Sequence, residues 1–493
     1  MKPVAENVIK SAMNILFIYS LYNVRGTKKP LHTQEQVSFG VSYISACLKE
    51  RGHDTKLLVL NRVDRGHESS VDGAIRAFKP RMVCVSAVTL EFPFISRIAG
   101  YIKSKYPDIY LLAGGMHVSL APEEAIAGPF DAICIGEGEA PAAEIAGQIE
   151  KGQRPSGIMN LWIKNGDSIE RNPARPFAQD LDALPFPDRR IWREWISEGA
   201  GTKYSILAGR GCPFECAYCC NHAVKKLAPG NYVRFRSPDN IIAELEECCS
   251  DLPAHDTVYF EMESMASGGK WAHEFLSKLK GHNLPAKRAL SYGTNIRITK
   301  GADLDGLFSE MSGAGFKYVN IGLESGSERI RKELLRRDYS DGDMAAAVEA
   351  ARRHGLKVCL NSIMGLPDET EEDINKTVEL NRICRPDWHF VSIFYPYPGT
   401  DLYAYCAGKG LIKKPLAEEL ESKKANILLP KLPARALEKN YLWFNYNVYR
   451  GYKPTHVLLA RVFRLWLWTK LHGSRAYRRL VDLAPFRWFK VLE

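Results

Sequence analysis

Three closely spaced cysteines are the residues in this sequence best suited to chemistry. Cys212, Cys216 and Cys219 follow Gly209 and Gly211, with three residues between the first two cysteines and two between the last two. Glycines let a backbone fold closely around a bulky inorganic group, and cysteine thiolates are the usual ligands of iron–sulfur clusters. Three thiolates can hold three irons of a four-iron cubane, which leaves the fourth iron open to a reactant.

The alternative for this segment is a structural zinc site, with Cys220 as the fourth ligand. Structural zinc usually takes its cysteines from two separated pairs, so one compact run of four fits it less well. All twelve cysteines of the chain are expected to be free thiols or metal ligands, because we expect a protein of a reducing compartment.

Alternating strands and helices position the cysteine segment, which follows the first strand of a long block. Short apolar runs predict six strands, at Tyr204–Ala208, Val258–Phe260, Ala289–Tyr292, Tyr318–Ile321, Val358–Met364 and Phe390–Phe394. Helical patterns fall between them, for example at Asn240–Cys248, Met344–His354 and Glu371–Asn381. This order predicts an incomplete parallel barrel, whose chemistry collects at the C-terminal ends of the strands.

An earlier α/β block precedes this barrel. Its apolar runs are short and do not alternate, as in strands buried on both faces, at Ile15–Tyr19, Lys56–Leu60, Met82–Val88, Ile109–Ala113 and Ala132–Ile135. Helical patterns at Phe39–Arg51 and Ile95–Lys105 complete the prediction of a doubly wound, Rossmann-like parallel sheet. No Gly-x-Gly-x-x-Gly follows the first strand, so a dinucleotide is a poor ligand for this sheet.

The cysteine segment, with Tyr218 directly before its third cysteine, resembles the signature of the radical S-adenosylmethionine (SAM) family. The resemblance implies a 4Fe-4S cluster held by the three cysteines, whose open iron binds SAM. Reductive cleavage then gives methionine and a 5′-deoxyadenosyl radical. Further motif matches across residues 204–400 imply that polar residues near the barrel mouth bind the cofactor, namely Tyr218, Glu261, Glu263, Asn295, Arg297, Glu324 and Asn361. The Gly293–Arg297 motif is expected just after the third strand.

The first domain resembles the cobalamin-binding domain that precedes the barrel in many radical SAM enzymes. Glycine-rich turns follow its fourth and fifth strands, where open parallel sheets bind ligands. The residues that this resemblance places around cobalamin are Ser86, Val88, Thr89, Gly114, Gly115, His117, Gly136, Glu137 and Gly138. Two alternatives stay open: His117 as an ordinary turn residue, and a domain that keeps the fold without cobalamin.

One departure concerns the loop after the first strand. Cobalamin domains that supply a histidine to the lower face carry Asp-x-His-x-x-Gly there, whereas this chain reads Ser-Leu-Tyr-Asn-Val-Arg at residues 20–25. We therefore expect neither that histidine nor the base of cobalamin itself on the lower face.

Charge is concentrated at the C-terminal end of the chain. Of the formal net charge of +10, the segment from Lys439 onward contributes eleven Lys and Arg against only Asp482 and Glu493. The main domains are therefore nearly neutral, and no nucleic-acid partner is expected. The segment is also rich in Trp and Tyr. We expect a helix packed on the barrel, because Lys470 falls roughly opposite Arg461 and spoils a clean polar stripe. The alternatives are peripheral contact with anionic lipid and, as a minor one, RNA binding.

These patterns predict a cobalamin-binding-like domain at 1–150, a proline-rich linker at 151–200, a radical SAM barrel at 201–400 and a helical region at 401–493. The expected activity is cobalamin-dependent methylation of an unactivated carbon in a hydrophobic or natural-product-like substrate. An external flavodoxin- or ferredoxin-type donor supplies electrons. The alternatives are a radical cyclase, coupling enzyme or oxidoreductase acting on a lipid or tetrapyrrole, and a non-catalytic cobalamin- or metal-responsive protein. The first thirteen residues lack the apolar core of a secretory signal, so we expect a cytoplasmic protein.

Overall fold

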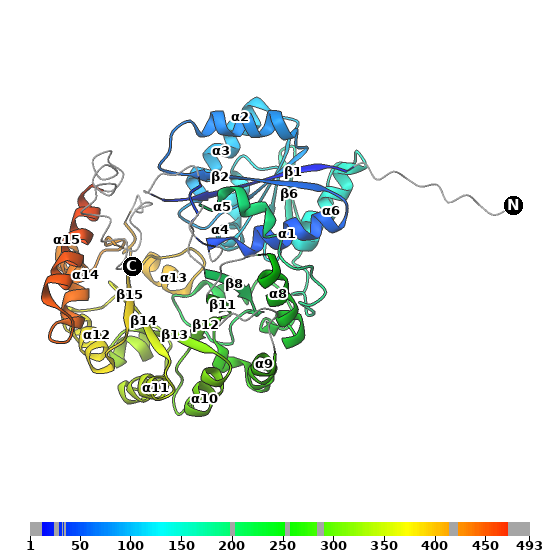
Figure 1. Ribbon diagram of the computed structural model, residues 1–493. Helices are drawn as coiled ribbons and strands as arrows, with labels where there is room; N and C mark the ends of the chain where they lie inside the picture. Colours follow the sequence, from blue (N-terminus) through cyan, green and yellow to red (C-terminus); the bar gives the residue numbers. More distant parts are fainter. Residues whose placement is uncertain are drawn as a thin grey trace.

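The computed structural model describes residues 12–23, 29–31, 33, 36–197, 203–251, 257–282, 290–413 and 423–471. It contains two large sheets, which lie one above the other in the view of Figure 1. The first has the strand order β2-β1-β3-β4-β5-β6-β7. Its five parallel strands are β1 (Asn14–Leu21), β2 (Asp54–Asn61), β3 (Met82–Ser86), β4 (Tyr110–Gly114) and β5 (Ala132–Cys134). The predicted doubly wound sheet is therefore confirmed.

Helices cover both faces of this sheet, as the apolar strands require. Along β1, Ile15 and Phe17 pack into one core cluster, and Leu16 and Ile18 pack into another on the opposite face. The first cluster includes α1 (Phe39–Glu50) and α6 (Glu139–Glu150); the second includes α2 (His67–Phe78), α3 (Phe92–Lys105), α4 (Met116–Leu120) and α5 (Pro122–Ala127). Burial on both sides explains why these strands show no polar alternation.

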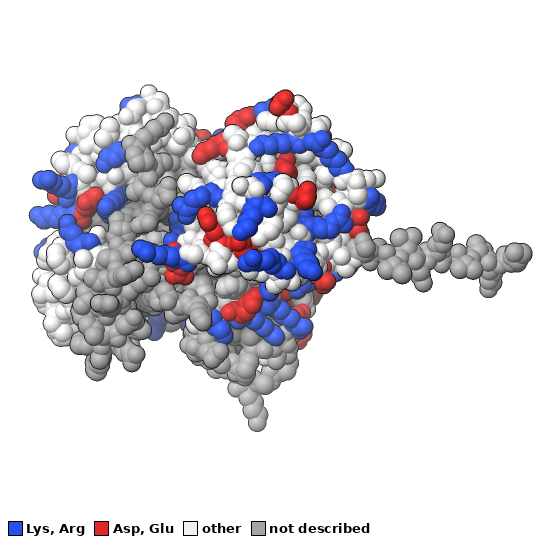
Figure 2. All heavy atoms as spheres, turned by 90° about the horizontal axis from the view of Figure 1, so that it is seen from above, with Lys and Arg blue, Asp and Glu red and all other residues white. Residues whose placement is uncertain are grey.

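The outer surface of the first domain carries charges of both signs. Viewed from above, its basic and acidic side chains are interspersed and neither sign covers the whole face (Figure 2). Ion pairs such as Lys105–Asp72, at 2.5 Å, join some of them. This mixture agrees with the near-neutral balance that the sequence gives for the chain before Lys439.

The expected linker holds a hairpin, β6 (Leu161–Asn165) and β7 (Ser168–Arg171). It does not stand alone, because β6 pairs antiparallel with β5 and so extends the first sheet by two strands. A 3₁₀ helix at Arg190–Trp195 follows, and its Trp192 is fully buried against α1, where the indole donates to Ser42 Oγ at 2.8 Å. The first domain therefore extends structurally beyond residue 150.

The second sheet is the predicted six-stranded partial barrel, with the order β15-β14-β13-β12-β11-β8 and parallel pairing throughout. Its strands are β8 (Lys203–Leu207), β11 (Thr257–Glu261), β12 (Ser291–Ile296), β13 (Phe316–Glu324), β14 (Lys357–Met364) and β15 (Trp388–Ile393). The helices connecting them are α8 (Pro238–Asp251), α9 (Lys270–Gly281), α10 (Asp305–Gly313), α11 (Asp341–Arg353) and α12 (Glu371–Cys384). Ser340 and Thr370 begin α11 and α12 with capping boxes, which satisfy the free amides of the first turn.

Three helices follow the barrel: α13 (Asp401–Gly408), α14 (Ala434–Tyr449) and α15 (Thr455–Leu471). The helix α14 packs on α12 and β15, and α15 packs on α14. Leu459, Phe463 and Trp466 lie on α15 at helical spacing and stay exposed. No helix in the described part of the chain has the length and apolar character that a membrane span needs. Arg475, Trp488 and the other residues after Leu471 lie outside the described residues.

The turn after β14 contains a buried carboxylic acid. Glu369 Oε2 accepts hydrogen bonds from the backbone amides of Gly365 and Leu366, and the side chain is buried. Burial raises the pKa of Glu369 to about 8. The folded protein therefore holds a proton that the unfolded chain releases above its ordinary pKa of about 4.3.

Replacing Glu369 with glutamine should stabilise the protein increasingly as the pH rises. The wild type loses stability between about pH 4.5 and pH 8, because its folded state binds the extra proton, with a slope of up to about 1.4 kcal/mol per pH unit. The substituted amide keeps an acceptor for the two backbone amides and carries no charge. Thermal melts between pH 5 and pH 8 measure the difference, with Glu372→Gln at an exposed ion pair as the control. A difference independent of pH would contradict the assignment.

Candidate active site

The C-terminal edge of the first sheet faces the mouth of the barrel. The short helix α7 (Cys220–Val224), which follows the cysteine loop, contacts α4 of the first domain. On the other side, Gly399 in the loop after β15 lies against Leu120 of α4, so closely that a Cβ there would be 2.9 Å from the Leu120 Cβ. The loops that follow the strands of both sheets therefore meet at one interface (Figure 1).

A cavity of about 320 Å³ lies at this interface. Its wall on the first domain includes six of the residues expected there, which are Ser86, Gly114, Gly115, Gly136, Glu137 and Gly138. Apolar side chains such as Phe17, Phe39 and Ile44 complete this side. The barrel contributes Leu207, Arg210, Gly211, Tyr232 and Arg234, from the end of β8 and the segments around the cysteine loop.

The cysteine loop begins where β8 ends and is shaped by glycines. Gly211 has φ +86°, and a Cβ on it would lie 2.0 Å from the carbonyl oxygen of Tyr232, so only glycine fits. Cys216 is buried, while Cys212 and Cys219 are half-buried. Burial raises the pKa of the Cys212 thiol to about 11, and the nearby Glu263, Cys216 and Cys219 act in the same direction. Cys216 and Cys219 therefore lie close enough to Cys212 to act on it electrostatically.

Polar residues from β11 and β12 approach this loop. Arg297 donates from Nη1 to Cys216 Sγ at 2.5 Å, and its guanidinium stacks on the Phe214 ring at 3.7 Å from the centroid. The carboxylate of Glu263 acts electrostatically on the cysteines of the loop. Asn295 lies in β12, where it donates to the Met262 carbonyl at 2.9 Å. The sequence pattern puts the motif that contains Asn295 and Arg297 after the third strand, but β12 runs to Ile296 and includes most of it.

Tyr218 is joined to the end of β13 through an arginine. Arg337 donates to the Tyr218 hydroxyl at 3.0 Å, to Glu324 Oε1 at 2.6 Å and to the Gly322 carbonyl at 2.9 Å. Glu324 is buried and has φ +59°. Burial raises the pKa of Tyr218, so the phenol stays protonated as a hydrogen-bond partner. The candidates Tyr218 and Glu324 are therefore brought together, with Arg337 between them.

The other candidates lie in different surroundings. Glu261 ends β11 and accepts from Ser205 Oγ at 3.5 Å; Asn361 lies on β14 and accepts from Cys359 Sγ at 3.6 Å. His117 is buried in α4, with its ring 4.2 Å from that of Phe92 and Nδ1 3.4 Å from Thr89 Oγ1. The described cavity wall includes neither His117 nor Thr89 nor Val88.

Comparison with known families decides between the interpretations of these two sites. The radical SAM superfamily matches residues 206–380, which cover the end of β8, the cysteine loop and the four strands β11 to β14. The B12 binding domain matches residues 33–146, which include the glycine turns of the first sheet. The chain is a radical SAM enzyme with a B12-binding domain.

Relatives of this radical SAM enzyme match over most of its length. An uncharacterized methyltransferase of Pyrococcus horikoshii is 26% identical over 76% of this chain and 79% of its own. The anaerobic magnesium-protoporphyrin IX monomethyl ester cyclase of Rubrivivax gelatinosus is 24% identical over 87% of this chain and 75% of its own. The hopanoid C-3 methylase of Methylococcus capsulatus is 24% identical over 73% of this chain and 67% of its own.

Solved structures share the fold. The cobalamin-dependent S-adenosylmethionine radical enzyme OxsB has a TM-score of 0.70 and 13% identity, covering 97% of this chain and 76% of that one. The radical S-adenosylmethionine methyltransferase TsrM of Kitasatospora setae has a TM-score of 0.66 and 14% identity, covering 95% and 98% of the two chains. The arrangement of the B12-binding domain, the barrel and the C-terminal helices is thus that of a known fold.

The residues present fit the cofactors of these two domains. Cys212, Cys216 and Cys219 are free thiols, and a cubane takes each thiolate on a different iron. On the other domain, Gly114 lines the cavity, and a Cβ on it would meet only Cys134 Cβ, at 3.9 Å. A larger side chain at Gly114 would enter the cavity, so the glycine leaves room for a flat ring.

Sequence reasoning found Arg297 but missed three other arginines of the site. Arg337, Arg210 and Arg234 bind carboxylates or phenols that are 13 to 119 residues away in sequence. Arg210 stands inside the cysteine segment and was accessible as a candidate. The partners of Arg234 and Arg337 follow from tertiary contacts, and no local pattern marks them.

Proposed function

We propose that this chain is a cobalamin-dependent radical SAM methylase that adds a methyl group to an unactivated carbon of a bulky hydrophobic substrate. The observation that carries the proposal is the shared interface: the glycine turns of the B12-binding domain line the same cavity as Arg210 and Gly211, which lie at the start of the cysteine segment of the barrel. A substrate held there would be within reach of both cofactors. The relatives named as methyltransferases or methylases agree with this activity.

The proposed reaction balances with two molecules of SAM and two electrons. One SAM accepts an electron, its carbon–sulfur bond breaks, and methionine and the 5′-deoxyadenosyl radical form. The radical takes a hydrogen atom from the substrate carbon and becomes 5′-deoxyadenosine. The second SAM supplies the methyl group and leaves as S-adenosylhomocysteine. An external flavodoxin- or ferredoxin-type protein supplies both electrons. Cobalamin, when bound, supplies a carrier for the methyl group.

In this scheme the chain's own residues bind and orient the cofactors, and they exclude water from the site. Cys212, Cys216 and Cys219 would hold the cluster, and Arg297 would donate a hydrogen bond to one of its sulfur ligands. Such hydrogen bonds tune cluster potential. Arg337 fixes the carboxylate of Glu324, which would accept a hydrogen bond from SAM. The apolar wall of the cavity would keep water from the radical.

A second candidate keeps the radical step without methyl transfer. The cyclase relatives from Rubrivivax gelatinosus and Cereibacter sphaeroides, which cover 87% and 82% of this chain, favour it. In that case the second SAM and the S-adenosylhomocysteine would be absent from the reaction. A bulky hydrophobic substrate, such as a lipid or tetrapyrrole, is proposed in both cases. Contact of the exposed α15 face with anionic lipid and a cytoplasmic location stay predictions.

One anaerobic experiment separates the candidates. The full chain is reconstituted with iron, sulfide and hydroxocobalamin, its iron and cobalt are counted, and it is then incubated with SAM and dithionite. A methylase should yield 5′-deoxyadenosine together with about one equivalent of S-adenosylhomocysteine per bound cobalt. 5′-Deoxyadenosine without S-adenosylhomocysteine would support the second candidate. Bound cobalt without iron or 5′-deoxyadenosine would overturn both.

A further inference from the structure

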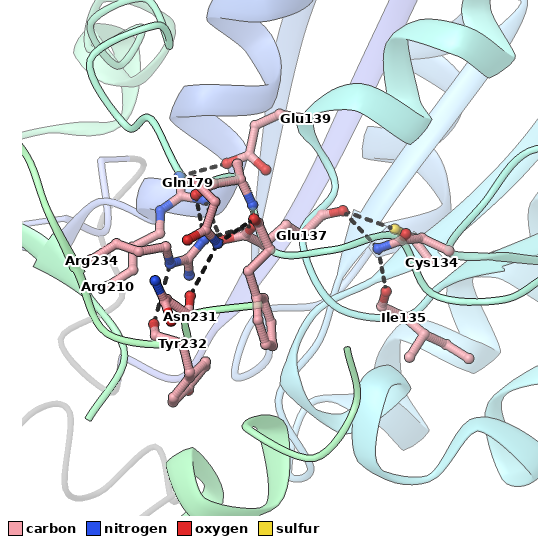
Figure 3. Close-up of polar contacts among 12 residues, drawn as sticks. Cys134, Ile135, Glu137, Glu139, Gln179, Arg210, Asn231, Tyr232 and Arg234 are labelled. Atoms are coloured by element: carbon pink, nitrogen blue, oxygen red, sulfur yellow. Dashed lines mark hydrogen bonds and ion pairs between the residues drawn. The ribbon is translucent and has the colours of Figure 1, made fainter. Parts of the chain in front are cut away.

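Two arginines of the barrel domain grip one carboxylate of the B12-binding domain. Arg210 lies in the short strand β9 (Gly209–Arg210) and Arg234 in β10 (Arg234–Phe235), and the two residues are paired directly across this antiparallel ribbon. Residues directly opposite each other in a ribbon point to the same side. Figure 3 shows both guanidinium groups directed at Glu137. The ribbon thus presents a double positive charge to the glycine turn after β5.

Glycine makes this ribbon unusually tight. A Cβ on Gly209 would lie 2.7 Å from the Phe235 ring and 2.8 Å from the Arg234 carbonyl oxygen. Gly211 leaves no space either, because the Tyr232 carbonyl lies against it. Arg210 is therefore held between two positions that tolerate no side chain, two residues before the first cysteine of the loop. The backbone of Arg210 is thus closely confined at the start of that loop.

The Glu137 carboxylate is fully engaged within the protein. Its Oε1 lies 3.0 Å from Arg210 Nη1 and 2.9 Å from Arg234 Nη1. Its Oε2 accepts from Arg234 Nη1 at 3.1 Å and from the Ala178 amide at 2.9 Å. Glu139, two residues on, accepts from Arg210 Nη2 at 2.6 Å. The sequence predicts that Glu137 lies at the cofactor, and it does line the cavity; its carboxylate also joins the glycine turn, the segment at Ala178 and the ribbon.

The four charged side chains of this network are largely buried. The exposed fraction of the side chain is 4% for Arg234, 17% for Arg210, 11% for Glu139 and 20% for Glu137. Although burial opposes it, the charges of Arg210 and Arg234 hold the pKa of Glu137 below its ordinary value. Removing one partner of such a cluster leaves a buried charge uncompensated, which is much more costly than losing a surface pair.

We propose that Arg210 is a positioning residue: through Glu137 and Glu139 it fixes the glycine turn of the B12-binding domain against the cysteine loop, and so sets cobalamin affinity from the opposite domain. The proposal rests on the proposed use of cobalamin by this chain. Arg210 itself belongs to the barrel and lies two residues before a cluster ligand. A substitution of Arg210 should nevertheless lower the cobalamin affinity of the other domain before it affects the cluster.

The test uses Arg210→Met in the reconstituted full chain, with hydroxocobalamin affinity measured by absorbance titration. We expect affinity to fall at least about tenfold, as for loss of one partner from a buried charge pair, while iron content and the EPR spectrum of the reduced cluster stay unchanged. Arg210→Lys, which keeps the charge but not the fork that reaches both glutamates, should recover part of the loss. Glu139→Gln is a milder variant that keeps the Glu137 contacts.

Two comparisons separate positioning from general destabilisation. Arg171→Met removes an exposed ion pair with Glu123 in the first domain and should leave affinity unchanged. The double variant Glu137→Gln/Arg210→Met should lose less cobalamin affinity than the sum of the two single losses, because both single variants break the Arg210–Glu137 contact. Additive losses, or wild-type affinity in Arg210→Met, would overturn the proposal.

A second readout does not depend on cobalamin. Amide hydrogen exchange at residues 136–139 should accelerate in Arg210→Met and stay unchanged in Arg171→Met, since the ribbon no longer anchors the turn. If the wild type bound no cobalamin, the proposed function would fail while this exchange difference still tested the link. Unchanged exchange at the turn would overturn the link itself.

Discussion

Replacing Cys216 with alanine should abolish both iron binding and SAM cleavage. Cys216 is the most buried of the three cysteines and accepts a hydrogen bond from Arg297, so it is fixed at the centre of the loop. Without its thiolate the cubane keeps two protein ligands. Loss of residues that merely support a ligand costs about 10–100-fold, so loss of a ligand should lower 5′-deoxyadenosine formation by more than about 100-fold. Iron analysis and product quantification check both effects.

The neighbouring Cys220 offers a matched control. It carries the same thiol one residue beyond Cys219, at the start of α7, and is half-buried. In a cluster held by three cysteines, Cys220→Ala should keep the iron content and the cleavage activity close to wild type. If both variants lost metal equally, a four-cysteine site would be the better interpretation. Full activity in Cys216→Ala would refute the assignment of the cluster.

Replacing Gly114 with valine should abolish cobalamin binding and leave the cluster intact. Gly114 ends β4 with a backbone conformation open to any residue, and a Cβ on it meets only Cys134 Cβ at 3.9 Å. The chain should therefore fold, while the two methyl groups of valine enter the cavity. We expect cobalt content after reconstitution to fall at least about tenfold, the effect of about 1.4 kcal/mol or more, with iron content unchanged.

The control for this substitution is Gly147→Val in α6. A Cβ on Gly147 meets no atom within 4 Å, and the residue lies within the helix and outside the cavity wall. Any loss of stability that valine causes in general should also appear in Gly147→Val, as a lower melting temperature without loss of cobalt. If Gly114→Val retained wild-type cobalt content, this cavity would not be the cobalamin site.

Most of the fold was accessible from the sequence, because buried parallel strands leave a clear pattern. Every predicted strand of both sheets is present within a few residues, since each apolar run contributes to a buried core. The end of β12 was misplaced because Thr294 and Asn295 are polar. Inside the barrel they are satisfied by the Phe260 and Met262 carbonyls, so polarity there did not indicate a loop.

The site was accessible only in part. The three cysteines and the glycine turns carry local spacing, and the loops that hold them meet at the domain interface. The role of Glu137 depends on Arg210 and Arg234, 73 and 97 residues away, and no local pattern encodes that contact. His117 lies two residues after Gly115 in sequence, which groups it with the glycines, and in α4 its ring packs against Phe92.

The conformation of Glu324 carries a consequence for engineering. A left-handed backbone is unfavourable for any residue with a Cβ by roughly 1–2 kcal/mol, and glycine or asparagine relieves it. A search for thermostable variants would therefore favour the very substitutions that remove the carboxylate held by Arg337. Selection for heat resistance and selection for turnover should pull this one position in opposite directions.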